Sequence, residues 1–270
     1  MIVIWNKHSS GLFMEVSKMK ASLQSEFLKI KRSGHLLLLA LIPFVTIFIA
    51  YIMVGPNILI PFSVYWWEAI FLIILISLLF ISDFLSEKKA GNFQNIIHNH
   101  YESEIIFSKI LLIFVQVLVA SILFVTFLKL VSLLYVGIIE VSAVKVLLTL
   151  CLMLVAVSWN LPLLYLLSNW INPYILLIGN TFICLLVAPL IAQTPFWFLF
   201  PFTYHYKVAQ VLLSVKPSGD VLTTGTTPGL MPLVLAILLS VLLTSVLVYL
   251  IGRRFSYARN LQKRSAKTKE

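Results

Sequence analysis

Charge is the scarcest property of this sequence. Only 11% of its 270 residues are charged, whereas 60% are hydrophobic and the mean hydropathy is +1.01. An ordinary soluble domain carries about 25% charged residues, so this composition excludes a soluble protein. It predicts an integral membrane protein of the all-α class.

Long polar stretches are also missing, which excludes a separate soluble domain. A bilayer core of about 30 Å is crossed by roughly 20 apolar residues in a helix. Six runs meet this requirement and predict six transmembrane helices over 36–54, 65–85, 110–136, 146–167, 173–192 and 231–251. We therefore expect one transmembrane domain over 36–251, preceded by a tail at 1–35 and followed by a basic tail at 252–270.

Cysteine is rare, and a nucleotide-binding loop is absent. Cys151 and Cys184 both fall in predicted spans, where a thiol usually behaves as a small hydrophobic residue. We predict no disulfide, metal site or catalytic role for them. None of the ten glycines is followed by lysine, which excludes the G-x-x-x-x-G-K-[ST] phosphate loop. The first apolar run has no cleavage pattern after it, so we expect no cleaved signal peptide.

The distribution of Lys and Arg predicts the orientation, because basic residues are retained on the cytoplasmic side. With the N-terminus inside, sixteen of these residues lie on the cytoplasmic side and three on the other. Both termini and the loop over 86–109 are therefore predicted to be cytoplasmic. The net charge of +10 then reflects topology and contact with anionic lipid rather than nucleic-acid binding.

The tail before the first span has an amphipathic pattern. Basic residues lie between apolar residues that recur at spacings of three and four. These apolar residues are Val16, Met19, Leu23, Phe27 and Ile30. This pattern is typical of a helix lying in the membrane interface. The alternative is a disordered basic tail.

The loop over 86–109 is the most polar long run inside the chain, yet it contains an apolar cluster. Phe93, Ile96 and Ile97 are spaced as one face of a short helix, and Gly91 permits a sharp turn before it. We interpret this cluster as a surface for a cytoplasmic partner. His98 and His100 point to different faces of a helix, so a solvated linker explains them better than a metal site.

The chain resembles the permease subunits of type-two ABC exporters. The resemblance rests on SEFLKIKRS before the first of six spans, and on E-x-x-A-G-x-F-Q-N-I with Lys109 opening the third span. Three further stretches resemble the lantibiotic-protection permeases of bacterial plasma membranes: AGNFQNI, WNLPLLYLLSNW, and PFTY with the later PSG. Family members often have a proline after the coupling segment, where this chain has His98-Asn99-His100.

The resemblance implies a function for the loop over 86–109. In such exporters this loop is a coupling helix that docks in a groove of a separate ATPase subunit. The implied coupling residues are Glu87, Lys88, Lys89, Gly91, Phe93, Gln94, Ile96 and Ile97. ATP and Mg²⁺ would be bound by that partner, and a second permease, identical or homologous, would complete the pathway. The implied cargo is an amphiphilic antimicrobial peptide expelled from the membrane.

Polar groups inside the predicted spans are few. Glu68 stands beside two tryptophans and is predicted to lie in an interfacial belt, while Lys129 is predicted to reach toward the outer face. Asn160, Pro162 and Asn180 interrupt apolar helices. We expect them to contact other helices, or alternatively to line the transport path.

The segment over 193–230 is aromatic and almost without charge. Its aromatic residues include Phe196, Trp197, Phe200 and Tyr204, and prolines break it too often for it to cross a membrane. We expect it to re-enter the membrane or lie at the outer interface, as an anchoring belt or a surface that meets the cargo.

Two alternative functions stay open. The same spans would suit another hydrophobic cargo, such as a drug, another peptide or a lipid-linked molecule. An intramembrane enzyme would need acid and histidine side chains facing one another. Glu68, Asp83 and His205 are scattered along the sequence, which disfavours that class.

Overall fold

The computed structural model describes residues 35–91, 102–135, 137, 139, 142–220 and 229–267, except the side chains of 102–104 and 255–267. No strand occurs within these ranges. Six helical segments are long and apolar enough to cross a membrane, covering His35–Val54, Leu59–Lys89, Ile105–Leu134, Ala143–Leu167, Pro173–Ala192 and Met231–Arg254. The prediction of an all-helical chain with six helices able to cross a membrane is confirmed for these residues.

Several spans consist of more than one helical element. The first is α2 (His35–Val54), and the second joins α3 (Leu59–Trp66), the π-helical turn η1 (Trp67–Phe71) and α4 (Leu72–Lys89). The third lies in α6 (Glu102–Leu134), and the fourth joins α7 (Ala143–Ala156) to α8 (Asn160–Leu167). The fifth joins α9 (Pro173–Phe182), the π-helical turn η2 (Ile183–Val187) and α10 (Ala188–Ala192). The sixth begins α12 (Met231–Lys267).

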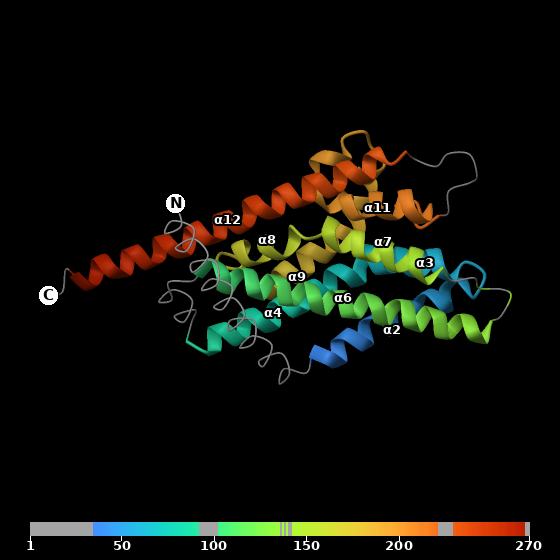
Figure 1. Cartoon of the computed structure of the whole chain (residues 1–270), viewed down its shortest axis with the longest axis horizontal. Helices are drawn as coiled ribbons and strands as arrows, with labels where there is room; N and C mark the ends of the chain where they lie inside the picture. Colours follow the sequence, from blue (N-terminus) through green and yellow to red (C-terminus); the bar gives the residue numbers. More distant parts are fainter. Residues whose placement is uncertain are drawn as a thin grey trace, which may run out of the picture.

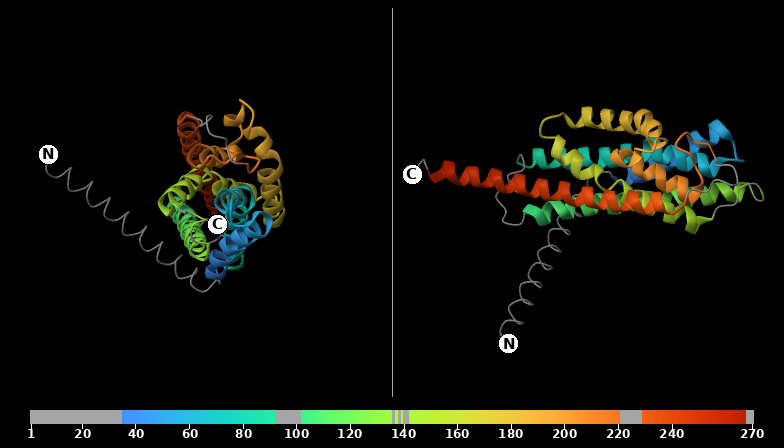
Figure 2. Two further views of the ribbon diagram at one scale, coloured as in Figure 1. Left: turned by 90° about the vertical axis from the view of Figure 1, so that its right-hand side faces the viewer. Right: turned by 90° about the horizontal axis from the view of Figure 1, so that it is seen from above.

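The helices form an elongated bundle, shown in Figure 1. We call the end at which α2 begins and α4 ends the near end, and the opposite end the far end. At the near end α12 continues past the other helices, as Figure 1 and the right-hand view in Figure 2 show. α4 lies at the centre, because it packs against α2, α6, α8 and α9. Its residues Leu75, Ile76, Leu79 and Phe80 are fully buried.

Local sequence explains the interruptions of the fourth and fifth spans. α7 ends before Asn160, and Pro162 lies in the first turn of α8, where a missing backbone N–H is tolerated. At the start of α9 the Asn172 side chain accepts a hydrogen bond of 2.9 Å from the backbone N–H of Tyr174. Pro173 occupies the first helical position, which matches its fixed φ angle.

The aromatic segment after the fifth span folds partly into the bundle. Two short turns, η3 (Trp197–Leu199) and η4 (Pro201–Thr203), lead into α11 (Tyr204–Leu213). α11 packs between α7 and α12 at the far end. Phe196 is 65% exposed whereas Tyr204 is 4% exposed. The segment is therefore neither a uniform belt nor a uniformly exposed surface.

Some sequence predictions fall on residues that the structure leaves undescribed. The interfacial helix is one of them, with Val16, Met19, Leu23, Phe27 and Ile30. The apolar cluster of Phe93, Ile96 and Ile97, together with the implied coupling residue Gln94, is another. Gly91, just before that cluster, is described and has a φ of 131°. This conformation favours glycine and suits the predicted turn.

Candidate functional site

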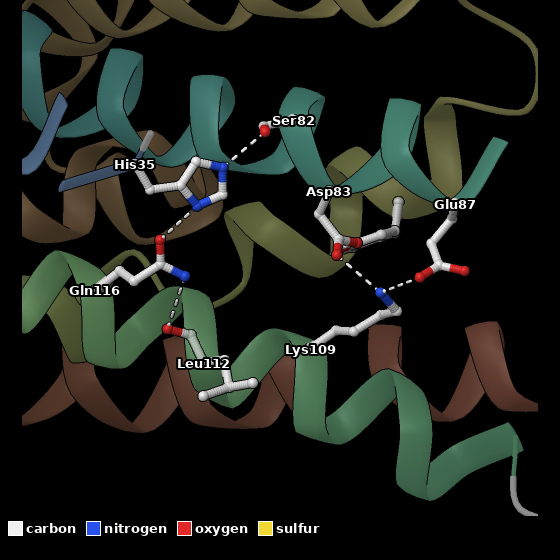
Figure 3. Close-up of polar contacts among 8 residues, drawn as sticks. His35, Ser82, Asp83, Glu87, Lys109, Leu112 and Gln116 are labelled. Carbon is white, nitrogen blue, oxygen red and sulfur yellow. Dashed lines mark hydrogen bonds and ion pairs between the residues drawn. The ribbon is translucent and has the colours of Figure 1, made fainter. Parts of the chain in front are cut away.

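A buried lysine joins two carboxylates at the near end of the bundle. The Nζ atom of Lys109 on α6 lies 2.8 Å from Oδ1 of Asp83 and 2.9 Å from Oε1 of Glu87, both on α4. The hydroxyl of Tyr165 on α8 donates to the other oxygen of Asp83. Figure 3 shows the lysine between the two acids. We call Asp83, Glu87, Lys109 and Tyr165 the lysine clamp.

The spacing of α4 explains why one lysine reaches both acids. Residues four apart lie on the same face of a helix, so Asp83 and Glu87 both face α6. The side chains of Lys109 and Glu87 are only 3% and 4% exposed. Charges this poorly hydrated depend on their partners, and removing one partner of such a pair typically costs about 3–5 kcal/mol. The clamp therefore joins α4 and α6 strongly.

A second polar contact ties the start of α2 to the same two helices. His35 Nδ1 lies 2.9 Å from Oε1 of Gln116 on α6, and His35 Nε2 lies 2.6 Å from Oγ of Ser82 on α4. Because an amide oxygen only accepts, Nδ1 of the ring donates here. Gln116 in turn donates to the carbonyl of Leu112 at 3.3 Å (Figure 3). Three helices thus meet through one buried imidazole.

A third polar contact lies deeper in the bundle. Asn160 on α8 and Asn180 on α9 exchange two amide hydrogen bonds of 2.8 and 3.1 Å, and Asn180 also donates to Ser77 on α4 at 3.0 Å. All three side chains are buried. The structure thus places Asn160 and Asn180 at a helix contact, with Pro162 buried next to them.

These three contacts share α4, which presents Ser77, Ser82, Asp83 and Glu87 to its neighbours. The lysine clamp has a further geometric consequence. Glu87 precedes and Lys109 follows residues 92–101 in the sequence, so the clamp joins α4 and α6 near the ends that lead into and out of that undescribed segment. The groups present can hold charge and fix the helices relative to one another.

The implied coupling residues that the structure describes differ in their exposure. Lys88 and Lys89 are exposed, together with Gly91. Glu87 is buried in the lysine clamp, so its side chain is engaged within the bundle instead of lying at an open rim. The docking role stays a prediction for the exposed lysines.

The belt position predicted for Glu68 is wrong, because the residue is fully buried in η1. The expectation that Glu68 and His205 lie far apart, which was based on their separation in sequence, is also wrong. Cys184 Sγ lies 3.5 Å from Nε2 of His205 and 3.6 Å from the carbonyl oxygen of Glu68. Folding thus brings together Glu68, Cys184 and His205, although Asp83 stays in the lysine clamp. Their separation in sequence concealed this contact.

The main residues missed from sequence are Asp83, Tyr165 and His35. The pair Asp83 and Glu87 carried a signal, since two acids four apart near the end of an apolar helix predict a shared cation. For Lys109 the sequence pattern indicates only that it opens the third span. Nothing local in the sequence indicated that His35 would join α4 to α6.

The described residues contain no group of three or more side chains able to hold a metal ion. No protein-family model matches the chain, and neither a curated protein nor a solved structure matches it.

Proposed function

We propose that this chain is the permease subunit of an ABC exporter, driven by a separate ATPase subunit. The observation that carries the proposal is the lysine clamp, which joins α4 to α6 on either side of the segment over 90–101. A coupling loop must pass a push from outside the bundle to the spans as a rigid-body movement. Lys109 meets this need, because it holds Asp83 and Glu87 at 2.8 and 2.9 Å on the opposite side of the loop.

The orientation and partners follow from the same proposal. The near end would face the cytoplasm, with both termini, so that the loop meets the ATPase that binds ATP and Mg²⁺. A second permease, identical or homologous, would complete the pathway. The chain would lie in a bacterial plasma membrane. We propose a lantibiotic-type antimicrobial peptide as cargo because the AGNFQNI and WNLPLLYLLSNW stretches resemble permeases that protect against such peptides.

The test is the loss of one apolar side chain from the loop. We expect Phe93→Ala, in the chain co-expressed with its ATPase and second permease, to weaken ATPase association by more than tenfold. Truncating a buried interface anchor costs about 2 kcal/mol or more. Peptide protection should fall in parallel, while membrane insertion stays unchanged.

The matched control is the paired change of His98 and His100 to Gln in the same loop. This pair should leave association and protection at the wild-type level. Full protection and wild-type association for Phe93→Ala would reject the coupling role. Loss of protection in the histidine pair alone would indicate a metal or proton function for that loop.

One observation favours the alternative class, an intramembrane enzyme. It is the contact between Cys184 and His205. A thiol acts as a nucleophile in its thiolate form, which burial in apolar surroundings disfavours. Cys184 is fully buried, and His205 is fully buried beside it. The export function therefore accounts for the site better.

A further inference from the structure

Two separate spans carry a π-helical turn where they meet. η1 in the second span contacts η2 in the fifth. Such turns are rare and often occur at functional sites. One consequence is visible in η2, where the carbonyl of Cys184 accepts a hydrogen bond of 2.9 Å from the hydroxyl of Tyr206 on α11. α11 is thus docked directly on a π-helical turn.

Unsatisfied polar atoms gather at this contact. Both carboxyl oxygens of Glu68 are buried and have no hydrogen-bond partner among the described residues. The same holds for Nδ1 of His205 and for neighbouring groups in the second span, which are Ser63 Oγ, Trp66 Nε1 and Trp67 Nε1. Buried polar groups are normally paired. Such a concentration of unpaired groups therefore calls for an explanation, such as a functional role or a bound water or ion.

The surroundings of Glu68 do not suit a carboxylate ion. The titratable side chains around it are Tyr65 on α3, Cys184 in η2, and His205 and Tyr206 on α11, with Asp220 beyond Tyr65. Burial lowers the pKa of His205 to about 3, so its ring is neutral. Lys207, the cation of α11, faces elsewhere, since its Nζ lies 5.4 Å from the Trp197 ring centroid and 3.1 Å from Gln210.

A buried carboxylate without a cation or donor is strongly unfavourable, so such a group takes up a proton instead. We propose that Glu68 is a proton-binding site and that its occupancy controls the docking of α11 on the bundle. With the proton bound, the neutral carboxyl group is compatible with the closed, dry contact between η1, η2 and α11.

Undocking of α11 would admit water to Glu68. The O–H bond of the carboxyl group then breaks, its electron pair stays on the carboxylate oxygen, and the proton passes to water. Closing requires the reverse step. Because the closed form binds one more proton than the open form, each unit of pH increase raises the opening constant by about tenfold while Glu68 titrates between the two forms. Higher pH therefore favours opening, and lower pH favours closure.

The dense packing around α11 makes its undocking a discrete event. Tyr206, Val208 and Ala209 are fully buried. After α11, a Cβ atom added to Gly219 would lie 3.2 Å from the ring of Tyr65, so the chain passes very close to α3. The proposal does not depend on the export function. Only the side from which the proton arrives follows from the proposed orientation.

Infrared spectroscopy of the full chain in membranes tests the proton directly. At neutral pH, we expect the carbonyl stretch of a protonated carboxyl group in the wild type and its loss in Glu68→Gln. Glu87→Gln is the matched control and should retain that band, since Glu87 is paired with Lys109. An unchanged band in Glu68→Gln would overturn the proposal, whatever the chain transports.

Hydrogen exchange tests the link to α11. With rising pH, amide exchange over 204–213 in the wild type should accelerate by about a further tenfold per unit relative to Glu68→Gln. The variant, which cannot release a proton, reports the intrinsic pH dependence of exchange. Exchange over 173–182 should respond equally in both proteins. Equal pH dependence over 204–213 would overturn the control of α11 docking, while loss of peptide export alone would bear only on the proposed function.

Discussion

The near and far ends of this bundle both contain acidic side chains, but the acids differ in their partners. At the near end, Asp83 and Glu87 share the ammonium group of Lys109. At the far end, Glu68 has no cation and no hydrogen-bond partner among the described residues. The difference lies in the partners of each acid. The paired acids join α4 to α6, whereas the isolated one is the site that we propose to bind a proton.

The largest expected effect comes from breaking the pairing at the near end. Lys109→Met leaves the buried carboxyl group of Glu87 and the partly buried one of Asp83 without this ammonium group, and we expect it to destabilise the folded chain by about 3–5 kcal/mol. Thermal unfolding in mild detergent measures this loss. The same change should also weaken peptide protection under the proposed function, because α4 and α6 would no longer move together.

A triple variant separates lost pairing from lost volume. Combining Lys109→Met with Asp83→Asn and Glu87→Gln removes every charge of the lysine clamp. We expect it to recover much of the stability that Lys109→Met loses, because replacing a buried ion pair with neutral groups is often nearly neutral. If Lys109→Met itself unfolds at the wild-type temperature, the pairing contributes nothing to the near end.

A smaller effect is expected at the amide pair between the two ends. Asn160→Leu removes both hydrogen bonds to Asn180 and leaves that amide with Ser77 only. Polar contacts between membrane helices contribute on average about 0.6 kcal/mol, so we expect a loss of about 1 kcal/mol.

A double-mutant cycle with Asn180→Leu isolates the contribution of the amide pair from changes in packing. Additive losses from the two single variants would mean that the amides are not coupled. A coupling energy of about 1 kcal/mol or less would mean that this neutral contact stabilises the bundle much less than the lysine clamp does.

The sequence predicted the six spans well because each needs only a long apolar run. Boundaries were less accurate where polar residues belong to a helix, as in the second span, which extends from 59 to 89 rather than from 65 to 85. Glu68 was misplaced because a tryptophan neighbour indicates an interface only when the helix side faces lipid. Here Trp67 is itself fully buried. Contacts between distant segments, such as that of Cys184 with His205, depend on helix packing that no local pattern specifies.

The smallest structural effect is expected from the exposed lysines that follow Glu87. Lys88→Gln with Lys89→Gln should leave the unfolding temperature unchanged, because neither side chain is buried in the lysine clamp. Under the proposed function the same pair should slow association with the ATPase, since charges at the rim of an interface act mainly on the rate of encounter. The slowing should diminish as salt is added, because salt screens exposed charges. Stopped-flow association at two ionic strengths measures both effects. If the pair lowers the unfolding temperature as much as Lys109→Met does, buried and exposed charges in this short stretch of α4 do not differ in their effect on stability. If the association rate is unchanged at low salt, these lysines do not guide docking.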